Sequence, residues 1–437
     1  MPRIIDCHVH HLDDTQVPWV RELGYDRVCL MDPRPEVLAE AVRKHPDFVI
    51  PLGWLPMHKE APAALEALER FRDVGCLGIK ICGARARYDD ESFYPVYEKI
   101  EQYGLPIFFH TGWLDQRIMQ QTYPTGLRTY ADWYHPITLD RITLDFPSIK
   151  LVAFHLGGEW IDHAVLLMHQ YPNIYADSCR GVETHRVLWD RLGGDAGGMR
   201  TLAKMVYGTD GMASRHTVAG RIRHWEEFLD AVKAPKGVRE LFWHRNALHI
   251  LALDDEFKKT VRLAEAPVTI TDFVTLQLDR FGEPAQSKTA CTITREKAGL
   301  RLDFTCEDPA AVDLVLSAEG PVGELWQNDA VEVFISPAND EHYFHFVVNA
   351  LGRASVEKDR GSVRELAEAA EGDITNEGWT VSLTIPFDLV GAAPAADAVW
   401  GLQLCRNKRT QPSESISWMQ VPGTYRDTSS FGRLVFE

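Results

Sequence analysis

The stretch RIIDCHVH, residues 3–10, decides how this chain folds. It reads as a buried strand, and side chains on a strand alternate between two faces, so Asp6, His8 and His10 point to the same side. Two imidazoles that converge at one strand end can bind a metal ion through neutral ring nitrogens. An H-x-H pair alone is weak evidence, because a chain with 17 histidines contains such pairs by chance. The rest of the sequence therefore has to support the site.

Short apolar runs alternate with amphipathic helical stretches as far as residue 255. The predicted strands are 3–10, 26–31, 47–55, 76–82, 105–110, 149–155, 173–178 and 204–209. The predicted helices between them include 35–44, 61–73, 93–103 and 161–170. This alternation is typical of β/α units around a parallel sheet. Eight units in about 250 residues predict a (β/α)8 TIM barrel, an α/β fold.

Polar side chains fall where the predicted strands end. Active sites of such barrels lie at the C-terminal ends of the strands. The residues at these ends are His8, His10, Lys80, His110, His155 and Asp210. Each one alone has an ordinary structural explanation, such as a helix cap or a hydrogen bond to a backbone carbonyl. Their convergence on one barrel mouth indicates a functional site.

Four motifs carry a family resemblance: HVH at 8–10, FHTG at 109–112, FHLGG at 154–158 and YGTDG at 207–211. Together they resemble the amidohydrolase superfamily, specifically its amidohydrolase-2 branch of metal-dependent TIM-barrel hydrolases and decarboxylases. The stretch RNALHIL at 245–251 is similar to the N-A-x-x-L element that closes such barrels. The resemblance is specific for the superfamily and not for the reaction.

The resemblance implies one divalent metal ion, most often zinc, held by His8, His10, His110 and Asp210, with water or substrate in an open position. An open position lowers the pKa of bound water toward ~7. Asp210 would orient that water and take its proton, while His155 would polarise the substrate or protonate the leaving group, or bind a second metal. Manganese is the alternative ion. A second ion bridged by a carbamylated Lys80 is the less favoured arrangement.

Basic side chains at the predicted mouth suggest how a substrate is held. An unmodified Lys80 would bind a substrate carboxylate or carbonyl. Six arginines follow predicted strand ends and could line an anion pocket: Arg85, Arg87, Arg117, Arg128, Arg180 and Arg215. Taken singly, each is better explained as a solvated loop charge, and we expect Arg180 to join Lys80 in substrate binding.

Composition and length narrow the class of protein. A length of 437 residues exceeds one usual hydrophobic core, so two domains are expected. The net charge of −17 argues against nucleic acid and anionic membranes as partners. We expect no secretory leader, because the predicted catalytic strand starts at residue 3, and we expect no membrane span. The eight cysteines are scattered, which favours buried free thiols in a reducing cytoplasm. A small-molecule substrate is the expected partner, and homo-oligomerisation stays open.

The pattern of apolar and polar residues changes after the predicted barrel. We predict the barrel at 1–257, a linker at 258–267 and a second domain at 268–437. The strands expected there are 268–278, 289–295, 299–305, 311–317, 330–336, 342–348, 379–386, 399–406 and 431–436. Segments of period two, broken by Gly, Pro, Asn and Asp, predict an antiparallel β-sandwich.

Several stretches of this domain resemble the family 9-like carbohydrate-binding modules. They are LWQNDAVEVFISP at 325–337, GWTVSLTIPF at 378–387, WGLQLCR at 400–406 and FGRL at 431–434. Such modules hold sugar rings between aromatic faces. Trp326 and Trp418 are the candidates for that role, and Trp379 and Trp400 are expected in the core. A structural or dimerisation role for the domain is as well supported as sugar binding.

Three classes of function stay open. The leading hypothesis is metal-dependent hydrolysis of a small carboxylate, lactone or amide through a metal-activated water. The second domain suggests a sugar-derived substrate as one possibility within this class. The second is nonoxidative decarboxylation of an aromatic or unsaturated acid by the same ligand set. The third is a non-catalytic carbohydrate-binding or scaffold protein. The intact set of strand-end residues argues against the third, because a retired site has no need to keep them.

Overall fold

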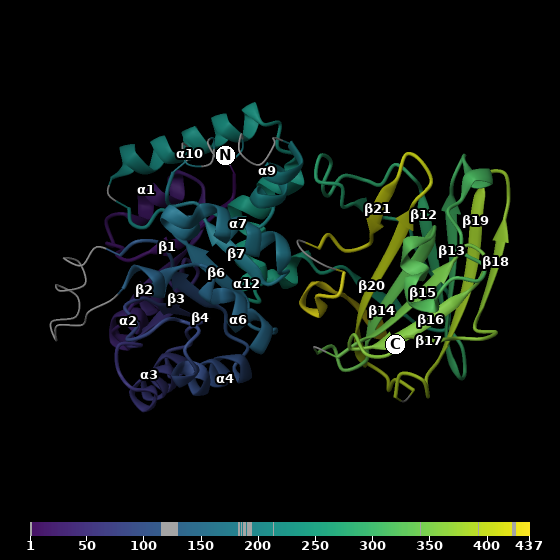
Figure 1. Cartoon of the computed structure of the whole chain (residues 1–437), viewed down its shortest axis with the longest axis horizontal. Helices are drawn as coiled ribbons and strands as arrows, with labels where there is room; N and C mark the ends of the chain where they lie inside the picture. The colour runs from purple at the N-terminus through teal and green to yellow at the C-terminus, as the bar shows by residue number, and fades with distance from the viewer. Residues whose placement is uncertain are drawn as a thin grey trace. The chain divides into compact units, whose positions relative to one another are not determined.

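The computed structural model describes residues 2–437 except 115–129, 182, 183, 185, 187, 188, 190–194, 213, 341, 392 and 422–424. The chain divides into two compact units, Met1–Asp254 and Asp255–Glu437, which we describe separately (Figure 1). Among the described residues, no helix has the length and apolar character needed to cross a membrane.

The first unit is built on one parallel sheet in which each strand pairs with the next along the chain. Its strands are β1 (Ile4–Val9), β2 (Tyr25–Asp32), β3 (Val49–Leu55), β4 (Gly78–Ile81), β5 (Ile107–His110), β6 (Leu151–Phe154), β7 (Ile174–Asp177) and β8 (Met205–Val206). The backbone N–H of Cys7 donates to the carbonyl of Tyr207 over 2.9 Å, so β1 borders the segment after β8. The predicted TIM barrel is confirmed.

Helices connect these strands. They are α1 (Val17–Glu22), α2 (Pro35–Lys44), α3 (Ala61–Asp73), α4 (Tyr94–Gln102), α6 (Thr138–Asp145), α7 (Ile161–Gln170), α9 (Asp195–Leu202), α10 (Arg215–Ala231), α11 (Lys236–Glu240) and α12 (Asn246–Ile250). The predictions for 35–44, 61–73 and 161–170 match α2, α3 and α7 at both ends. Both α2 and α3 have proline in the first turn and arginine in the last, which suits the fixed proline φ and the helix dipole. They pack against β2 and β3 on the outside of the sheet (Figure 1).

The N-A-x-x-L element has a physical role in this unit. The side-chain amide of Asn246, the first residue of α12, is buried and donates to the carbonyls of Ala203 and Met205 over 3.0 and 2.8 Å. A buried amide that binds two backbone carbonyls ties this helix to the short strand β8. The element therefore secures the last strand of the barrel.

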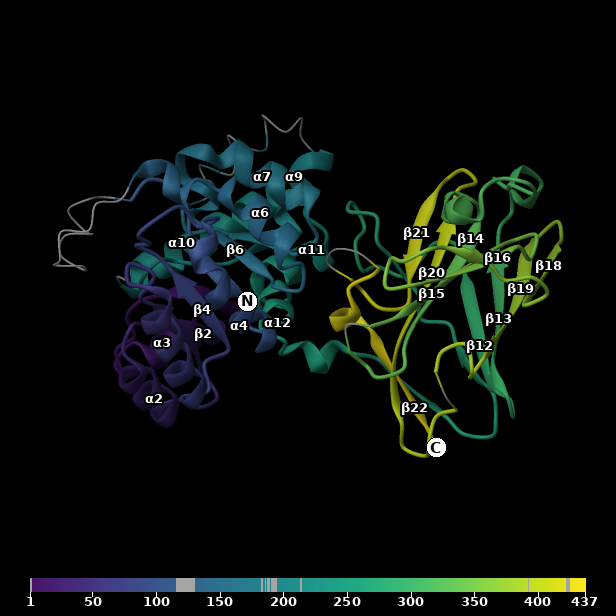
Figure 2. The ribbon, with the colours of Figure 1, turned by 60° about the horizontal axis from the view of Figure 1, so that its bottom comes forward.

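The second unit consists mainly of two antiparallel sheets. One has the order β10 (Val268–Ile270), β12 (Thr289–Arg295), β13 (Gly299–Glu307), β19 (Gly378–Pro386) and β18 (Ala370–Ile374). The other has the order β11 (Val274–Thr275), β21 (Glu414–Ser417), β20 (Val399–Lys408), β14 (Ala330–Ser336), β15 (Phe344–Asn349), β16 (Ala354–Lys358) and β17 (Arg364–Glu365), with β22 (Gly432–Phe436) paired to β20 and to β9 (Thr260–Leu263). Figure 2 shows β12, β13, β18 and β19 in one layer and β14, β15, β16, β20 and β21 in the other.

Alternating residues of the two layers fill one core. Val331, Val333 and Ile335 of β14 belong to the same buried cluster as Leu300 and Leu302 of β13. This period of two is the pattern that predicted a sandwich, and it places one face of each strand inward. Trp379 and Trp400 also lie in this cluster, as predicted.

The structure differs from the sequence prediction at several strands. The stretch 311–317 was expected to be a strand, but Ala311–Asp313 forms a 3-10 turn. The short strand β9 lies inside the predicted linker, where it pairs in parallel with β22. The sequence does not predict strands β16, β17, β18 and β21; β17 and β18 are largely exposed, so they lack the apolar alternation that marks a strand in the sequence.

Candidate metal centre

The strand ends of the first unit bring the predicted residues to one side of the barrel. His8 lies in β1, Lys80 in β4 and His110 at the last position of β5. His155 follows β6 directly and Asp210 lies in the turn after β8. Parallel strands of a barrel end on the same side, so these side chains share its C-terminal mouth.

Three ligand atoms form a nearly equilateral triangle at this mouth. The Nε2 atoms of His8 and His10 lie 3.1 Å apart, and Oδ1 of Asp210 lies 3.2 Å from the first and 3.3 Å from the second. Two ligands of one tetrahedral zinc ion, with bonds of about 2.0–2.1 Å, are separated by about 3.4 Å. The ring of His8 is fully buried, whereas the side chains of His10 and Asp210 are 32% and 41% exposed. The triangle therefore has the spacing of a metal site that opens to solvent.

A buried carboxylate orients the first histidine. Nδ1 of His8 lies 2.6 Å from Oδ2 of Asp177, the last residue of β7, and both side chains are inaccessible to solvent. Oδ1 of the same carboxylate accepts from the backbone N–H of His155 over 2.6 Å. A carboxylate at Nδ1 keeps the proton there and leaves the Nε2 lone pair for a metal. The ring of His8 also stacks on Phe154 at 3.8 Å.

A second buried carboxylate, that of Asp6, holds the backbone of β1. Oδ1 of Asp6 accepts from the backbone N–H groups of His8 and Thr209, over 3.0 and 3.1 Å, and Oδ2 accepts from the hydroxyl of Thr209 over 2.7 Å. Burial raises the pKa of Asp6 to about 7. This side chain ties β1 to the turn that carries Asp210.

The remaining two histidines form a chain with a cysteine. Nε2 of His155 lies 3.0 Å from Nδ1 of His110, and Nδ1 of His155 lies 3.0 Å from Sγ of Cys179 and 4.0 Å from Oδ2 of Asp210. Nε2 of His110 is buried and has no hydrogen-bond partner within the described part of the chain. His110, predicted as a ligand, thus contacts His155 and is not one of the three atoms of the triangle.

Burial sets the charge state of these side chains. It lowers the pKa of the His8 and His110 imidazoles well below their ordinary value, and that of His155 to about 3. Burial alone would raise the pKa of Asp210, but the hydrogen bond from His10 and the neighbouring imidazoles hold it well below its usual range. Neutral imidazoles and an ionised carboxylate are the forms that bind a divalent ion.

The side chain of Lys80 is buried at the same mouth. Its side chain is 1% exposed, and Nζ has no hydrogen-bond partner among the described residues. The ammonium lies 4.0 Å from the centre of the Phe154 ring. Burial lowers the pKa of Lys80. An ammonium without a hydrogen bond is costly to bury, so this atom is suited to an anionic or carbonyl ligand.

Arg180 is tied to the neighbouring loops. Its guanidinium donates to Oε1 of Glu159 over 2.9 Å, and Oε2 of Glu159 accepts from the backbone N–H of Trp113 over 2.8 Å. The loops after β5 and β6 also approach closely, since a Cβ on Gly158 would lie 2.6 Å from the Cα of Gly112. Glu159 therefore fixes the position of an arginine that is 39% exposed.

The other predicted arginines differ in their surroundings. Arg85, Arg87 and Arg215 each pair with an acidic side chain, over 3.3, 2.9 and 2.8 Å. Such surface ion pairs contribute little to stability, and they are the ordinary role that the sequence favours for each arginine taken singly. Arg117 and Arg128 lie outside the described residues.

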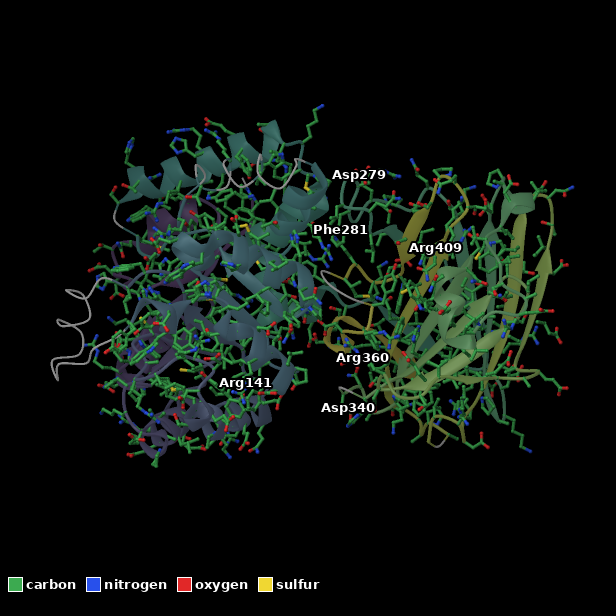
Figure 3. All side chains as sticks on the ribbon, in the orientation of Figure 1. Arg141, Asp279, Phe281, Asp340, Arg360 and Arg409 are labelled. Atoms are coloured by element: carbon green, nitrogen blue, oxygen red, sulfur yellow. The ribbon has the colours of Figure 1, made fainter. Side chains whose placement is uncertain are left out.

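The two tryptophans proposed for sugar binding have different environments. Trp326 is 47% exposed, and the guanidinium of Arg409, which Figure 3 labels, lies 5.9 Å from its ring. Trp418 is 2% exposed and belongs to the core, so its ring has no free face for a sugar and our expectation of a surface role is corrected. The physical reason is Gly432, where a Cβ would lie 2.6 Å from the Trp418 ring. The absent side chain leaves the space that the indole fills.

Sequence reasoning missed two residues of the site, Asp177 and Cys179. Asp177 ends a buried strand, so the rule that selected the other strand ends could have found it. Cys179 carries no such signal, because its role depends on which side chain faces it. All eight cysteines are free thiols, and seven are buried, as predicted.

Several solved structures are similar to one or the other part of this chain. A solved TIM-barrel protein from Bordetella bronchiseptica is 16% identical, covers 57% of this chain and 99% of its own, and has a TM-score of 0.43. A 2,6-dihydroxybenzoate decarboxylase from Rhizobium is 17% identical, with coverage of 58% and 100% and a TM-score of 0.43. A family 9 carbohydrate-binding module from Caldicellulosiruptor kristjanssonii is 15% identical, with coverage of 41% and 94% and a TM-score of 0.31. No curated protein matches the chain.

Family models match both parts of the sequence. Residues 302–437 match the carbohydrate family 9 binding domain-like model. Residues 5–253, more than half of the chain, match the amidohydrolase model. The chain therefore belongs to the amidohydrolase family.

Proposed function

We propose that this protein is a metal-dependent hydrolase that acts on a small carboxylate-bearing lactone or amide. The observation that carries the proposal is the triangle of two imidazole nitrogens and one carboxylate oxygen, with sides of 3.1, 3.2 and 3.3 Å. Three acceptor atoms so close together repel one another unless a cation or protons lie among them. A divalent cation removes that repulsion.

The residues present fit a divalent ion such as zinc. His8, His10 and Asp210 would hold it, and His110, whose buried Nε2 lacks a partner among the described residues, is the fourth ligand that we propose. Imidazole and carboxylate donors suit zinc, and they also accept manganese. When bound, the ion supplies a Lewis acid and a water of lowered pKa.

The protein's own side chains would manage the protons. Asp210 is 41% exposed and ionised, so its Oδ2 can accept a proton from the attacking water and return it to the leaving group. Nδ1 of His155 lies 4.0 Å from that oxygen and can donate a hydrogen bond to the substrate carbonyl. A new carbon–oxygen bond forms from water while the ester or amide bond breaks, so atoms and protons balance.

Lys80 and Arg180 would select the substrate. Nζ of Lys80 lacks a hydrogen-bond partner within the described part of the chain, and a substrate carboxylate would supply one. Arg180 is fixed by Glu159 at the neighbouring loop and would add a second cation at the rim. We propose an anionic substrate on this basis.

Metal analysis is the first test. We expect about one zinc or manganese ion per chain in purified protein and its loss in a His8→Ala/His10→Ala variant. His45→Ala is the matched control, because His45 pairs with Asp14 outside the cluster and should leave the metal content unchanged. Two ions per chain would instead support a carbamylated Lys80. The absence of metal after reconstitution would refute the proposal.

A substrate screen separates hydrolysis from decarboxylation. Lactones, amides and aromatic acids would be incubated with the metal-loaded enzyme, and acid release and carbon dioxide release would be measured separately. Acid release that disappears in Asp210→Asn, with metal content retained, would support hydrolysis. Carbon dioxide release would move the assignment to a decarboxylase of the same family.

For the second unit we propose sugar binding at Trp326. The indole is the more exposed of the two candidate rings, at 47%, and aromatic faces bind sugar rings through apolar contact. Titration calorimetry with soluble oligosaccharides should give binding that Trp326→Ala abolishes. Leu351→Ala, an exposed apolar residue of the same unit, is the control. Equal binding by the tryptophan variant would refute this role.

A further inference from the structure

We propose that Arg221, a residue of α10, is a positioning residue that holds Asp210 where its carboxylate meets the two imidazoles of the triangle. The inference rests on the proposed function, because Asp210 is a metal ligand and a proton carrier only in that proposal. Nη1 of Arg221 donates a hydrogen bond to the backbone carbonyl of Thr209, the residue directly before Asp210. Arg221 therefore acts through the turn that carries the ligand.

The backbone of Asp210 has a conformation that few residues other than glycine adopt. Its φ is +55°, in the left-handed region. Aspartate tolerates this region better than most residues, but the region is still strained, and a residue stays there only when its surroundings hold it. In this conformation Oδ1 of Asp210 lies 3.2 Å from Nε2 of His8 and 3.3 Å from Nε2 of His10. The triangle thus depends on groups that keep the turn from relaxing.

The residue before Asp210 is bound from three directions. The backbone N–H of Thr209 donates to Oδ1 of Asp6 over 3.1 Å, and its hydroxyl donates to Oδ2 over 2.7 Å. Its carbonyl accepts from Arg221. Thr209 is buried, and each of its polar groups has a partner. Asp6 therefore holds the amino side of this residue, and Arg221 holds its carbonyl side.

The contact at the carbonyl fixes the φ angle of Asp210. The carbonyl of Thr209 and the N–H of Asp210 belong to one planar peptide group. When this plane rotates, ψ of Thr209 and φ of Asp210 change together, so a guanidinium that fixes the direction of the carbonyl also fixes φ at the aspartate. Without that contact, the plane can turn and Asp210 can relax to negative φ. The carboxylate would then move away from the two imidazoles.

The side chain of Arg221 suits this role. A guanidinium stays charged in proteins, and a hydrogen bond from a charged donor is stronger than one between neutral groups. Other arginines of this unit, Arg85, Arg87 and Arg215, pair with carboxylates, whereas Arg221 binds a backbone carbonyl next to a proposed ligand. The partner of Arg221 is therefore a group whose direction affects the site.

The zinc affinity of the full-length protein tests this role without a substrate. The apo-protein competes with a chromophoric chelator for Zn²⁺, and circular dichroism verifies the fold. Arg221→Met keeps a long side chain but loses the donor, so its affinity for zinc should fall by about 10- to 100-fold. Arg221→Lys keeps a cationic donor and should lose less affinity. Arg223→Met is the matched control and should bind zinc as the wild type does, because Arg223 lies on the same helix but is exposed and 3.9 Å from Glu227.

A double-mutant cycle separates positioning from a general loss of structure. In an Asp210→Ala background there is no carboxylate to position, so adding Arg221→Met should change the zinc affinity by less than about threefold. An equal loss of affinity in both backgrounds would overturn the positioning role, and so would wild-type affinity in Arg221→Met alone. If the methionine variant does not fold, Arg221→Lys takes its place in the cycle, and its loss of affinity must again disappear in the Asp210→Ala background. These failures leave the metal-dependent function standing, whereas no zinc binding by the wild-type protein would overturn both.

Discussion

Replacing Asp177 by Asn should weaken metal binding, because it changes which ring nitrogen of His8 carries the proton. Asp177 accepts hydrogen bonds from the backbone N–H of His155 and from Nδ1 of His8, each over 2.6 Å, and also from the side chain of Cys179. Asparagine has the same shape but one acceptor and one donor group. The backbone N–H cannot reverse its direction, so the amide oxygen stays against His155 and the amide nitrogen faces His8.

This leaves His8 with two unfavourable states. Either its Nδ1–H opposes the amide N–H, or the ring moves its proton to Nε2, where the metal has to bind. A hydrogen bond to a charged group contributes about 1.5–3 kcal/mol, and both partners here are fully buried. At about 1.4 kcal/mol per factor of ten, the affinity for the metal should fall by about 10- to 150-fold.

Asp6→Asn is the matched control for this change. Asp6 is as buried as Asp177 and lies on β1 together with His8, but one of its oxygens accepts from the hydroxyl of Thr209. A hydroxyl can rotate to accept from the new amide, so no donors are opposed. We expect the affinity of this variant to stay within about threefold of wild type.

The assay is competition for zinc between apo-protein and a chromophoric chelator, near neutral pH, with circular dichroism to verify folding. Asp177→Asn should lose affinity while it keeps its fold. An affinity within about threefold of wild type would refute the reasoning, and so would an equal loss in Asp6→Asn.

Three further outcomes follow from the structure. Gly158→Ala should lower the melting temperature more than Gly104→Ala. Both residues have positive φ (+60° and +63°), but only at Gly158 would the added Cβ meet backbone atoms, and this overpacking costs about 1–3 kcal/mol. Equal shifts in melting temperature would contradict this reasoning. His345→Gln should destabilise the second unit most at low pH. Burial disfavours the charged form of His345, but its 2.5 Å hydrogen bond to Glu332 raises the pKa of the imidazole above 6.5. The stabilisation is therefore complete below pH 6.5 and is lost as the pH rises through the folded-state pKa. Thermal melts of the wild type and the His345→Gln variant across a pH series should show a difference in melting temperature that becomes smaller as the pH rises. A chain truncated after Leu253 should remain a soluble, metal-binding barrel by circular dichroism and metal analysis, and aggregation would contradict independent folding.

The sequence by itself determined the barrel, the sandwich and the ligands that lie close together along the chain. His8 and His10 are two residues apart on one strand, so they share a face in any arrangement of the sheet. The strand-end rule then placed His155 and Asp210 at the same mouth, because parallel strands of a barrel end on one side. These inferences depend only on local periodicity and strand direction, which the order of apolar residues encodes.

Only the tertiary structure decided which side chains meet. Asp177 is 169 positions from His8 in the chain, and their contact depends on how eight strands close and twist together. The burial of Trp418 depends on the glycine that faces it from β22. The lack of a hydrogen-bond partner for Lys80 among the described residues depends on which neighbouring side chains reach its Nζ atom. Such pairings arise from register and packing between distant segments. The residues next to one partner in the sequence carry no information about the distant partner, so no local pattern predicts these contacts.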